Sequence, residues 1–175
     1  MLQRIKRLFR HRWVDQASLR RALPAAAMAR LQQLVQASEQ RHSAEICIYV
    51  EAGLPISYLM RPSSTREITR QRATTLFGKL RVWDTEHNNG VLLYLLLSER
   101  SIEIVADRGI DRLVAPEQWQ QILANMGEPL RSGRFEAGLS QAVTQITALL
   151  AQYFPLAEGQ PNPNELPDAP VLGQR

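Results

Sequence analysis

The sequence predicts an α/β fold built around a mixed β-sheet. The run 91–97 is uninterrupted and apolar, which is typical of a strand buried on both faces. An earlier strand-like run, 45–51, is separated from it by a helical segment, and a third run, 101–106, follows after three polar residues. Because a strand–helix–strand crossover is right-handed and parallel, the first two strands should be parallel. The tight connection predicts that the third strand is antiparallel.

The length and composition predict a single domain with two appendages. A chain of 175 residues with 45% hydrophobic content is sufficient for one core of ordinary size. The predicted division is a basic amphipathic arm at 1–22, an α/β domain at 23–154 and a Pro-rich disordered tail at 155–175. No apolar run approaches the roughly 20 residues that span a bilayer, and no signal-peptide pattern is visible. We therefore expect a cytoplasmic protein.

The N-terminal arm carries most of the positive charge. Residues 1–21 hold seven Lys and Arg against Asp15, while the whole chain has a net charge of +4. Phe9 and Trp13 recur at helical spacing among the cations, so the arm could lie on an anionic membrane surface, peripheral at the inner membrane. It could instead pack on the domain or on a second subunit. Nucleic-acid binding is disfavoured, because base-stacking aromatics and a recognised binding module are both missing.

The remaining elements follow from local signals. Pro24 sits at the first turn of a predicted helix over 24–41. Ser64 and Glu67 have the spacing of a capping box, which starts a helix that ends near residues 77–78. Pro116 opens another helix, and the apolar period over 135–153 predicts an amphipathic helix packed on the core.

The predicted topology brings several polar residues to one edge of the sheet. Parallel strands start at the same edge, so Ser43 and Glu45 should lie near Asn88 and Asn89. The third strand returns to this edge, and the turn 107–111 should therefore approach the loop before the central strand. Oxygen ligands that converge from loops are what Ca²⁺ or Mg²⁺ requires, and such a metal can activate water against a phosphate ester.

The predicted metal ligands are the oxygen-bearing residues of these two loops. They are Asp84, Glu86, Asn88, Asp107 and Asp111. The same residue types are also common in turns, because their side chains bond the nearby backbone, so a purely structural role is the alternative.

Three further polar residues are candidates for binding phosphate or another ligand: Arg108, His87 and Asn89. Arg108 could neutralise a phosphate or pair with a neighbouring carboxylate. His87 could act as a general base, with Glu86 or Asp107 as an orienting partner, or it could be an exposed loop histidine. The sequence contains no P-loop, dinucleotide, serine-hydrolase or zinc motif, and hence no self-sufficient catalytic signature.

Three segments in a fixed order resemble the TPM domain family of a plant thylakoid-lumen protein and many bacterial envelope proteins. These segments are 89–97, 100–109 and 131–138, and the resemblance covers about residues 23–154. It implies a three-layer α/β/α sandwich with a central mixed sheet. It also implies divalent-cation binding in an acidic loop cluster, and the phosphatase activity reported for the plant member.

Two departures from the family pattern bear on the predicted site. Family members usually carry Asp-Asn-Gly before the central strand, where this chain has Asn at position 88. The turn after the third strand is usually Gly-aromatic-Gly, whereas here it begins with Asp107. Envelope members also carry a signal peptide and a membrane helix, and neither pattern is visible in this sequence. We therefore expect a divergent bacterial member that is a non-catalytic interaction module with a protein partner, tethered to the cytoplasmic membrane face by its basic arm. The alternative is a divalent-metal-dependent phosphatase-like enzyme.

Overall fold

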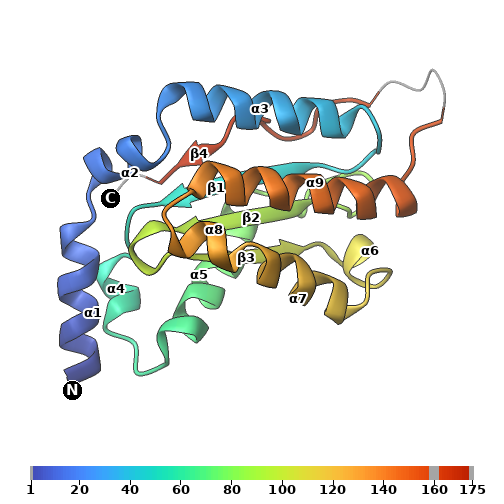
Figure 1. Cartoon of the computed structure of the whole chain (residues 1–175). Coiled ribbons are helices and arrows are strands. Elements are labelled where there is room, and N and C mark those ends of the chain that lie inside the picture. The colour runs from blue at the N-terminus through green and yellow to red at the C-terminus, as the bar shows by residue number, and fades with distance from the viewer. Residues whose placement is uncertain (1, 158–161, 174–175) are drawn as a thin grey trace.

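The computed structural model describes residues 2–157 and 162–173 (Figure 1). Nine helices and four strands lie within these residues, and a short 3₁₀ turn follows the second strand. The helices are α1 (Leu2–Trp13), α2 (Gln16–Ala22), α3 (Ala25–Glu39), α4 (Ile56–Leu59), α5 (Thr65–Lys79), α6 (Arg108–Asp111), α7 (Pro116–Asn125), α8 (Gly127–Arg131) and α9 (Phe135–Tyr153). The strands are β1 (Ile46–Glu51), β2 (Val91–Leu96), β3 (Ser101–Ala106) and β4 (Val171–Leu172).

The sheet has the predicted mixture of parallel and antiparallel pairs. Its order is β3-β2-β1-β4. β1 and β2 run parallel with Ile46 opposite Val91, and β2 and β3 form an antiparallel hairpin with Val91 opposite Ala106. β2 ends one residue earlier than predicted, because residues 97–99 form the 3₁₀ turn and Arg100 adopts a left-handed φ of 48°.

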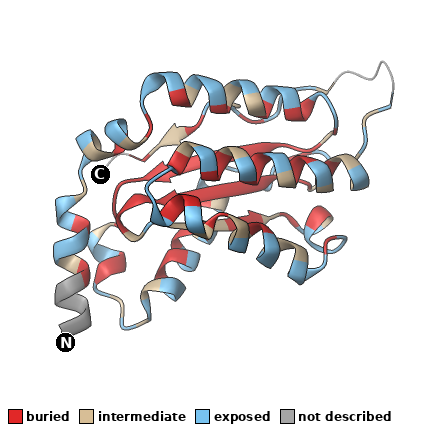
Figure 2. Cartoon of the chain, viewed as in Figure 1, coloured by how far each residue is buried: buried red, intermediate tan, exposed pale blue. Residues whose placement is uncertain are grey.

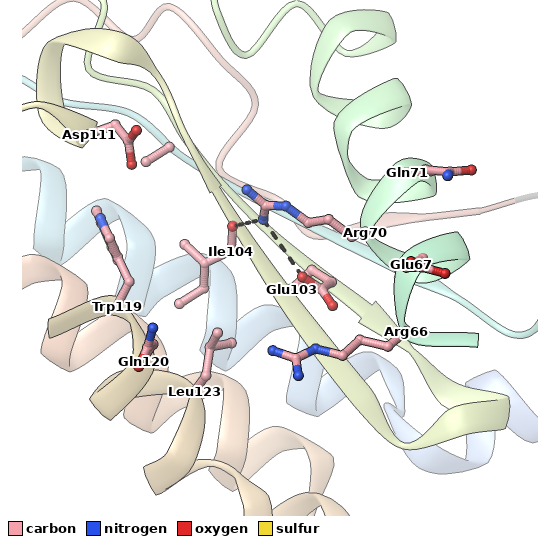
Figure 3. Close-up of a pocket in the computed structure, with 11 residues that line it drawn as sticks. Arg66, Glu67, Arg70, Gln71, Glu103, Ile104, Asp111, Trp119, Gln120 and Leu123 are labelled. Carbon is pink, nitrogen blue, oxygen red and sulfur yellow. Dashed lines mark hydrogen bonds and ion pairs between the residues drawn. The ribbon is translucent and has the colours of Figure 1, made fainter. Parts of the chain in front are cut away.

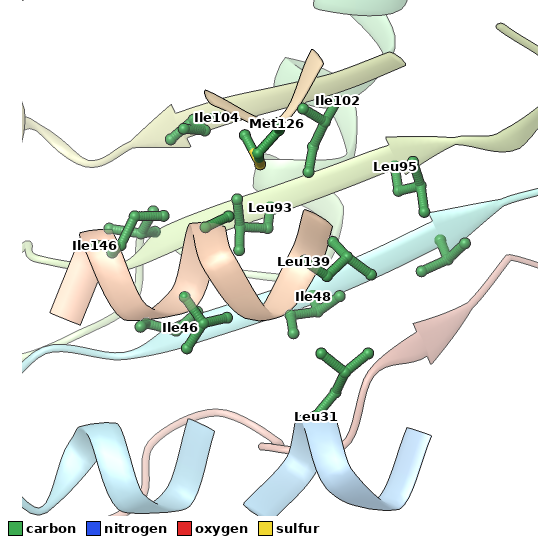
Figure 4. Packing of buried hydrophobic residues seen from close by; sticks show 14 of the residues in the cluster. Leu31, Ile46, Ile48, Leu93, Leu95, Ile102, Ile104, Met126, Leu139 and Ile146 are labelled. Atoms are coloured by element: carbon green, nitrogen blue, oxygen red, sulfur yellow. The ribbon is translucent and has the colours of Figure 1, made fainter. Parts of the chain in front are cut away.

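Helices cover both faces of the sheet, which gives the expected three-layer α/β/α sandwich (Figure 2). The first core cluster packs β1, β2 and β3 against α3, α7 and α9; it includes Ile48, Leu93 and Leu139 (Figure 4). The second cluster lies on the other face under α5 and includes Leu92 and Ile68. Residues of the central strands alternate between these clusters, so both faces of β2 are buried as its unbroken apolar sequence predicts.

Local sequence signals set the helix that links the parallel strands. The Ser64 hydroxyl accepts a hydrogen bond from the Glu67 amide at 3.3 Å, and the Glu67 carboxylate accepts one from the Ser64 amide at 2.8 Å. The predicted capping box is therefore confirmed, and it starts α5.

The Pro-rich segment differs from the predicted disordered tail of 155–175. Its described residues run back along the sheet, and β4 adds to β1 as a parallel neighbour, with Tyr49 opposite Val171. Leu166 is buried, and its amide donates to Glu45 at 3.2 Å. Composition misled here because a few apolar residues among the prolines are enough to cover the open edge of β1. Residues 158–161 and 174–175 lie outside the described part.

The N-terminal segment continues into the body of the domain. Leu19 of α2 is fully buried in the first core cluster, although it falls within the predicted arm of 1–22. α1 lies against α4 at the end of the molecule where β1 and β2 finish (Figure 1). Within residues 2–157 and 162–173, no helix has the length and apolar character that a bilayer span needs.

Candidate functional site

The two predicted loops meet at the edge of the sheet where β2 begins. The Asp107 amide donates to Gly90 O at 2.9 Å, and the Gly109 amide donates to Asn88 O at 2.8 Å. Asn88 has a left-handed φ of 52°. A Cβ on Gly109 would lie 2.4 Å from Asn88 O, so the loops approach too closely for a side chain at that position.

The start of β1 joins the same edge, as the parallel pairing predicts. The Asn89 side-chain amide donates to Ser43 O at 3.1 Å, and the Val91 amide donates to Glu45 O at 2.9 Å. Asn89 is fully buried, and its backbone amide donates to the Thr85 hydroxyl at 3.1 Å. Asn89 therefore ties the loop before β2 to the chain before β1.

The two loops that meet at this edge carry two buried side-chain oxygens with no hydrogen-bond partner among the described residues, and Oε1 of Glu45 at the start of β1 is a third. The two loop oxygens are Oδ1 of Asn89 and Oδ2 of Asp107. The other carboxylate oxygen of Asp107 accepts from the Arg108 amide at 2.7 Å, which caps α6. Buried oxygens are normally paired, so these two atoms identify the part of the edge with unused capacity to bind a cation or a proton donor.

Arg108 is engaged by the loop opposite it. Its Nε and Nη2 donate to Oδ1 of Asn88 at 3.1 and 3.0 Å. The guanidinium of Arg108 therefore hydrogen-bonds to the same Asn88 oxygen that would ligate a bound metal. Arg108 thus bonds to an amide oxygen and not to the neighbouring carboxylate that was one predicted alternative, and phosphate binding by this arginine stays a prediction.

The remaining predicted ligands point to other partners. Asp84 forms an ion pair with Arg81, and Glu86 is exposed with its amide donating to Glu165 at 3.0 Å. Asp111 lines a cleft between α5 and α7. His87 is exposed. Residues 2–157 and 162–173 contain no group of three or more His, Cys, Asp or Glu side chains arranged to hold a metal, so a metal site here stays a prediction.

A second acidic cluster, which no sequence pattern predicts, lies beside the start of β1. Burial raises the pKa of Glu39 to about 8 and that of Glu45 to about 7. Glu39 accepts from the Ile46 amide at 3.1 Å, and Asp168 from the C-terminal segment faces the same cluster. Asp168 lies far along the sequence from Glu39 and Glu45, so no local spacing could have revealed the complete cluster.

A different kind of surface lies at the opposite end of the sheet, on α1. Arg7 is buried and donates to the backbone oxygens of residues 59, 61 and 63. His11 is also buried; its Nδ1 accepts from the Leu54 amide at 3.0 Å and its Nε2 lies 2.9 Å from Glu99. Since Nδ1 accepts, Nε2 carries the proton that is shared with Glu99. These contacts fix one side of α1 to the domain.

The outward side of α1 is apolar and cationic. Phe9 and Trp13 are 63% and 82% exposed, and Ile56 of α4 is 72% exposed. Phe9, Arg12 and Ile56 line a common groove of about 720 Å³. Trp13 follows Phe9 by one helical turn, on the same side of the helix. We call these four residues the α1 face.

An α/β/α sandwich with a mixed sheet and a polar loop edge is the class of domain that these observations define. The family model of the TPM domain matches residues 14–149, and the chain belongs to this family. The fold is also similar to the NMR structure of the BA42 protein from the psychrophilic bacterium Bizionia argentinensis, with a TM-score of 0.71 and 24% identity over 86% of this chain and 95% of that chain. No curated protein matches the chain.

Proposed function

We propose that this chain is a non-catalytic TPM-domain interaction module that binds a protein partner and is held at an anionic membrane surface by the α1 face. The observation that carries the proposal is the exposure of Phe9 and Trp13 on a helix whose other side is fixed by buried Arg7 and His11. Exposed aromatic residues beside cations are typical of helices that lie in the membrane interface. The cytoplasmic membrane face is the anionic surface that such a helix would meet.

The charges around the α1 face favour an anionic partner. Arg12 is exposed on this face, and Arg10 is 62% exposed beside it while it pairs with Glu99 at 2.7 Å. Each cation near an anionic lipid surface contributes about 1 kcal/mol, and the aromatic rings add burial of apolar area. Since α1 is already fixed to α4, membrane contact requires no folding of the helix.

The loop edge supports the non-catalytic part of the proposal. Two side chains expected to act on a ligand are already engaged by cations of the protein itself: Asn88 by Arg108 and Asp84 by Arg81. His87, the candidate base, is exposed in its loop. A general base needs an orienting partner and a site that excludes water. The exposure of His87 therefore favours a structural role for this loop.

Vesicle co-sedimentation tests the membrane part. Trp13→Ser combined with Phe9→Ser should lower the pelleted fraction on phosphatidylserine vesicles about tenfold or more, because the apolar contact is lost while the charge is kept. Trp83→Ser is the matched control: Trp83 is 48% exposed and lies at the opposite end of the sheet. Equal pelleting of the two variants and the wild type would refute the tether.

A second candidate function is favoured by the two unpartnered oxygens, Asn89 Oδ1 and Asp107 Oδ2. Both are hard ligands, and they lie on loops that meet at one sheet edge, so they could bind Ca²⁺ or Mg²⁺ as in a metal-dependent phosphatase-like enzyme. Amide NMR during titration with millimolar Ca²⁺ or Mg²⁺ tests this candidate. Shifts confined to residues 84–90 and 107–111 would support it, and unchanged spectra would exclude cation binding at this edge.

A further inference from the structure

The outer edge of β3 opens into a cleft between two helices. β3 is the last strand of the sheet on its side, with α5 and α7 on the two faces next to it. The cleft has a volume of about 590 Å³ and includes Ile104 and Ala106 of the strand itself. Figure 3 shows side chains from both helices converging on this strand edge.

Alternate backbone groups of β3 face into this cleft. The Asp107 amide donates to Gly90 O beside β2, so in an antiparallel ladder the groups of residues 101, 103 and 105 also face β2. Those of residues 102, 104 and 106 face outward. Arg70 confirms the direction, because its guanidinium donates to Ile104 O. No other hydrogen bond within residues 2–157 and 162–173 uses these outward groups.

The two walls of the cleft differ in chemistry. On the α5 side, Arg66 and Arg70 reach over the strand, and Arg70 lies 3.7 Å from Glu103. Two further carboxylates line the cleft: Glu67, which accepts from the Ser64 amide, and Asp111. On the α7 side, Trp119 and Leu123 pack against the apolar face of β3. Side chains of a strand point alternately to opposite faces, so a strand added here would direct every second residue to the cations and the others to the apolar wall.

We propose that β3 receives an extended acidic-and-apolar peptide of a protein partner as a fifth strand of the sheet. Its backbone pairs with residues 102, 104 and 106. Its acidic side chains meet Arg66 and Arg70, and its apolar side chains pack on Trp119 and Leu123. Arg70 already pairs with Glu103, and the Glu67 carboxylate accepts from the Ser64 amide. Among the described residues no ion pair engages Arg66, so its guanidinium is what selects an acidic side chain. In the absence of a partner, Arg70 covers the middle of the edge, a common protection of exposed strands.

This inference rests on the interaction-module part of the proposed function and names how the partner binds. It does not depend on the α1 face, because that face lies on a different part of the molecule. Loss of vesicle binding would leave the β3 proposal standing, and failure of peptide binding would leave the membrane tether standing.

The test uses a synthetic six-residue peptide of alternating Glu and Val with blocked ends. In ¹⁵N NMR of the whole chain, the amide signals of residues 102, 104 and 106 should shift, and their hydrogen exchange should slow. Ala106→Pro removes an outward N–H without removing a bond to β2, and it should weaken peptide binding about tenfold. Ala106→Ser retains the N–H and should bind as the wild type does.

Charge reversal gives the specificity arm of the test. Arg66→Glu should weaken binding of the Glu-Val peptide and strengthen binding of a matched Lys-Val peptide. A Glu-Val peptide with alternate amides N-methylated should not bind the wild type, a result that does not depend on whether Ala106→Pro folds. Unshifted outward amides, binding of the N-methylated peptide, or self-association of the chain through β3 would each overturn the proposal.

Discussion

Arg72 and Glu51 form a bidentate ion pair inside the second core cluster. Nε of Arg72 lies 3.0 Å from Oε2 of Glu51, and Nη2 lies 2.7 Å from Oε1. Tyr94 donates to the same carboxylate at 2.7 Å, and both members of the pair are buried. This contact joins α5 to the end of β1, so it links the helix of the crossover directly to the sheet.

Loss of one partner of this pair should destabilise the fold strongly. Arg72→Ala leaves the Glu51 charge buried without its cation, and the free energy of unfolding should fall by about 3–5 kcal/mol in urea denaturation. Arg30→Ala is the matched control, because Arg30 pairs with Glu136 at 2.6 Å while 59% exposed, and its loss should lower the free energy of unfolding far less. If the free energy of unfolding falls by similar amounts in the two variants, the buried ion pair stabilises the fold no more than the exposed pair does.

Two glycines should respond oppositely to alanine. A Cβ on Gly90 would lie 2.0 Å from Val82 O, whereas one on Gly78 in α5 would meet nothing within 4 Å. Gly90→Ala should therefore lower the free energy of unfolding by about 1–3 kcal/mol or more, since backbone must move. Gly78→Ala should raise it by roughly 0.5–1 kcal/mol through helix propensity. Thermal denaturation of both variants checks this, and a stable Gly90→Ala would contradict the close approach at the loop edge.

Stability should fall as the pH rises from neutral to mildly alkaline. Burial raises the pKa of Glu39 from 4.5 to about 8, so the folded chain holds a proton there that the unfolded chain has lost. Between these values each rise in pH therefore favours unfolding. His42 affects stability in the opposite direction. Because burial lowers its pKa from 6.5 to about 4, its contribution makes stability rise with pH between these two values.

The window from pH 6.5 to 8 isolates the carboxyl groups. Glu39→Gln can still accept from the Ile46 amide, and it should flatten the decline of the urea midpoint across that window. Glu136→Gln should leave the decline unchanged, because Arg30 lowers the pKa of Glu136 and its titration lies at more acid pH. If the urea midpoint of Glu39→Gln declines as steeply as that of the wild type, groups other than Glu39 cause the pH dependence.

Removal of the Arg108 guanidinium should make the loop edge a better cation site. Arg108→Ala frees Oδ1 of Asn88 and removes a positive charge from its neighbourhood. We expect Ca²⁺ to bind about tenfold more tightly than to the wild type, equivalent to about 1.4 kcal/mol. Arg112→Ala, which removes an exposed arginine one turn away, is the control. If Arg108→Ala and Arg112→Ala give the same NMR titration curve, the guanidinium does not compete with the cation.

The parts of the fold that local patterns determine were predictable. The apolar strand β2, the capping box at Ser64 and Glu67, and the periodic helix α9 each depend on residues close together in the sequence. Their pairing followed from connection lengths, and it correctly placed Asn89 beside Ser43. This is why the loop edge could be located before its contacts were known.

Features that depend on distant partners were not predictable. β4 is two residues long, and its order comes from the open edge of β1. Arg7 is a cation by composition, yet it is buried because the backbone oxygens of residues 59, 61 and 63 surround its guanidinium. The orientations of Asp84 and Asp111 also depend on local ion pairs and on α6, so loop proximity alone overestimated how many carboxylates would converge.

The return of β4 to β1 sets an order on how the chain can fold during synthesis. β1 is complete at residue 51, but the neighbour on its outer side is made only when residues 171–172 leave the ribosome. Until then, β1 presents an unpaired edge, and Glu45 lacks the Leu166 amide that it bonds in the finished protein. The nascent domain therefore keeps one edge of β1 open to strand pairing with other chains until residues 171–172 emerge.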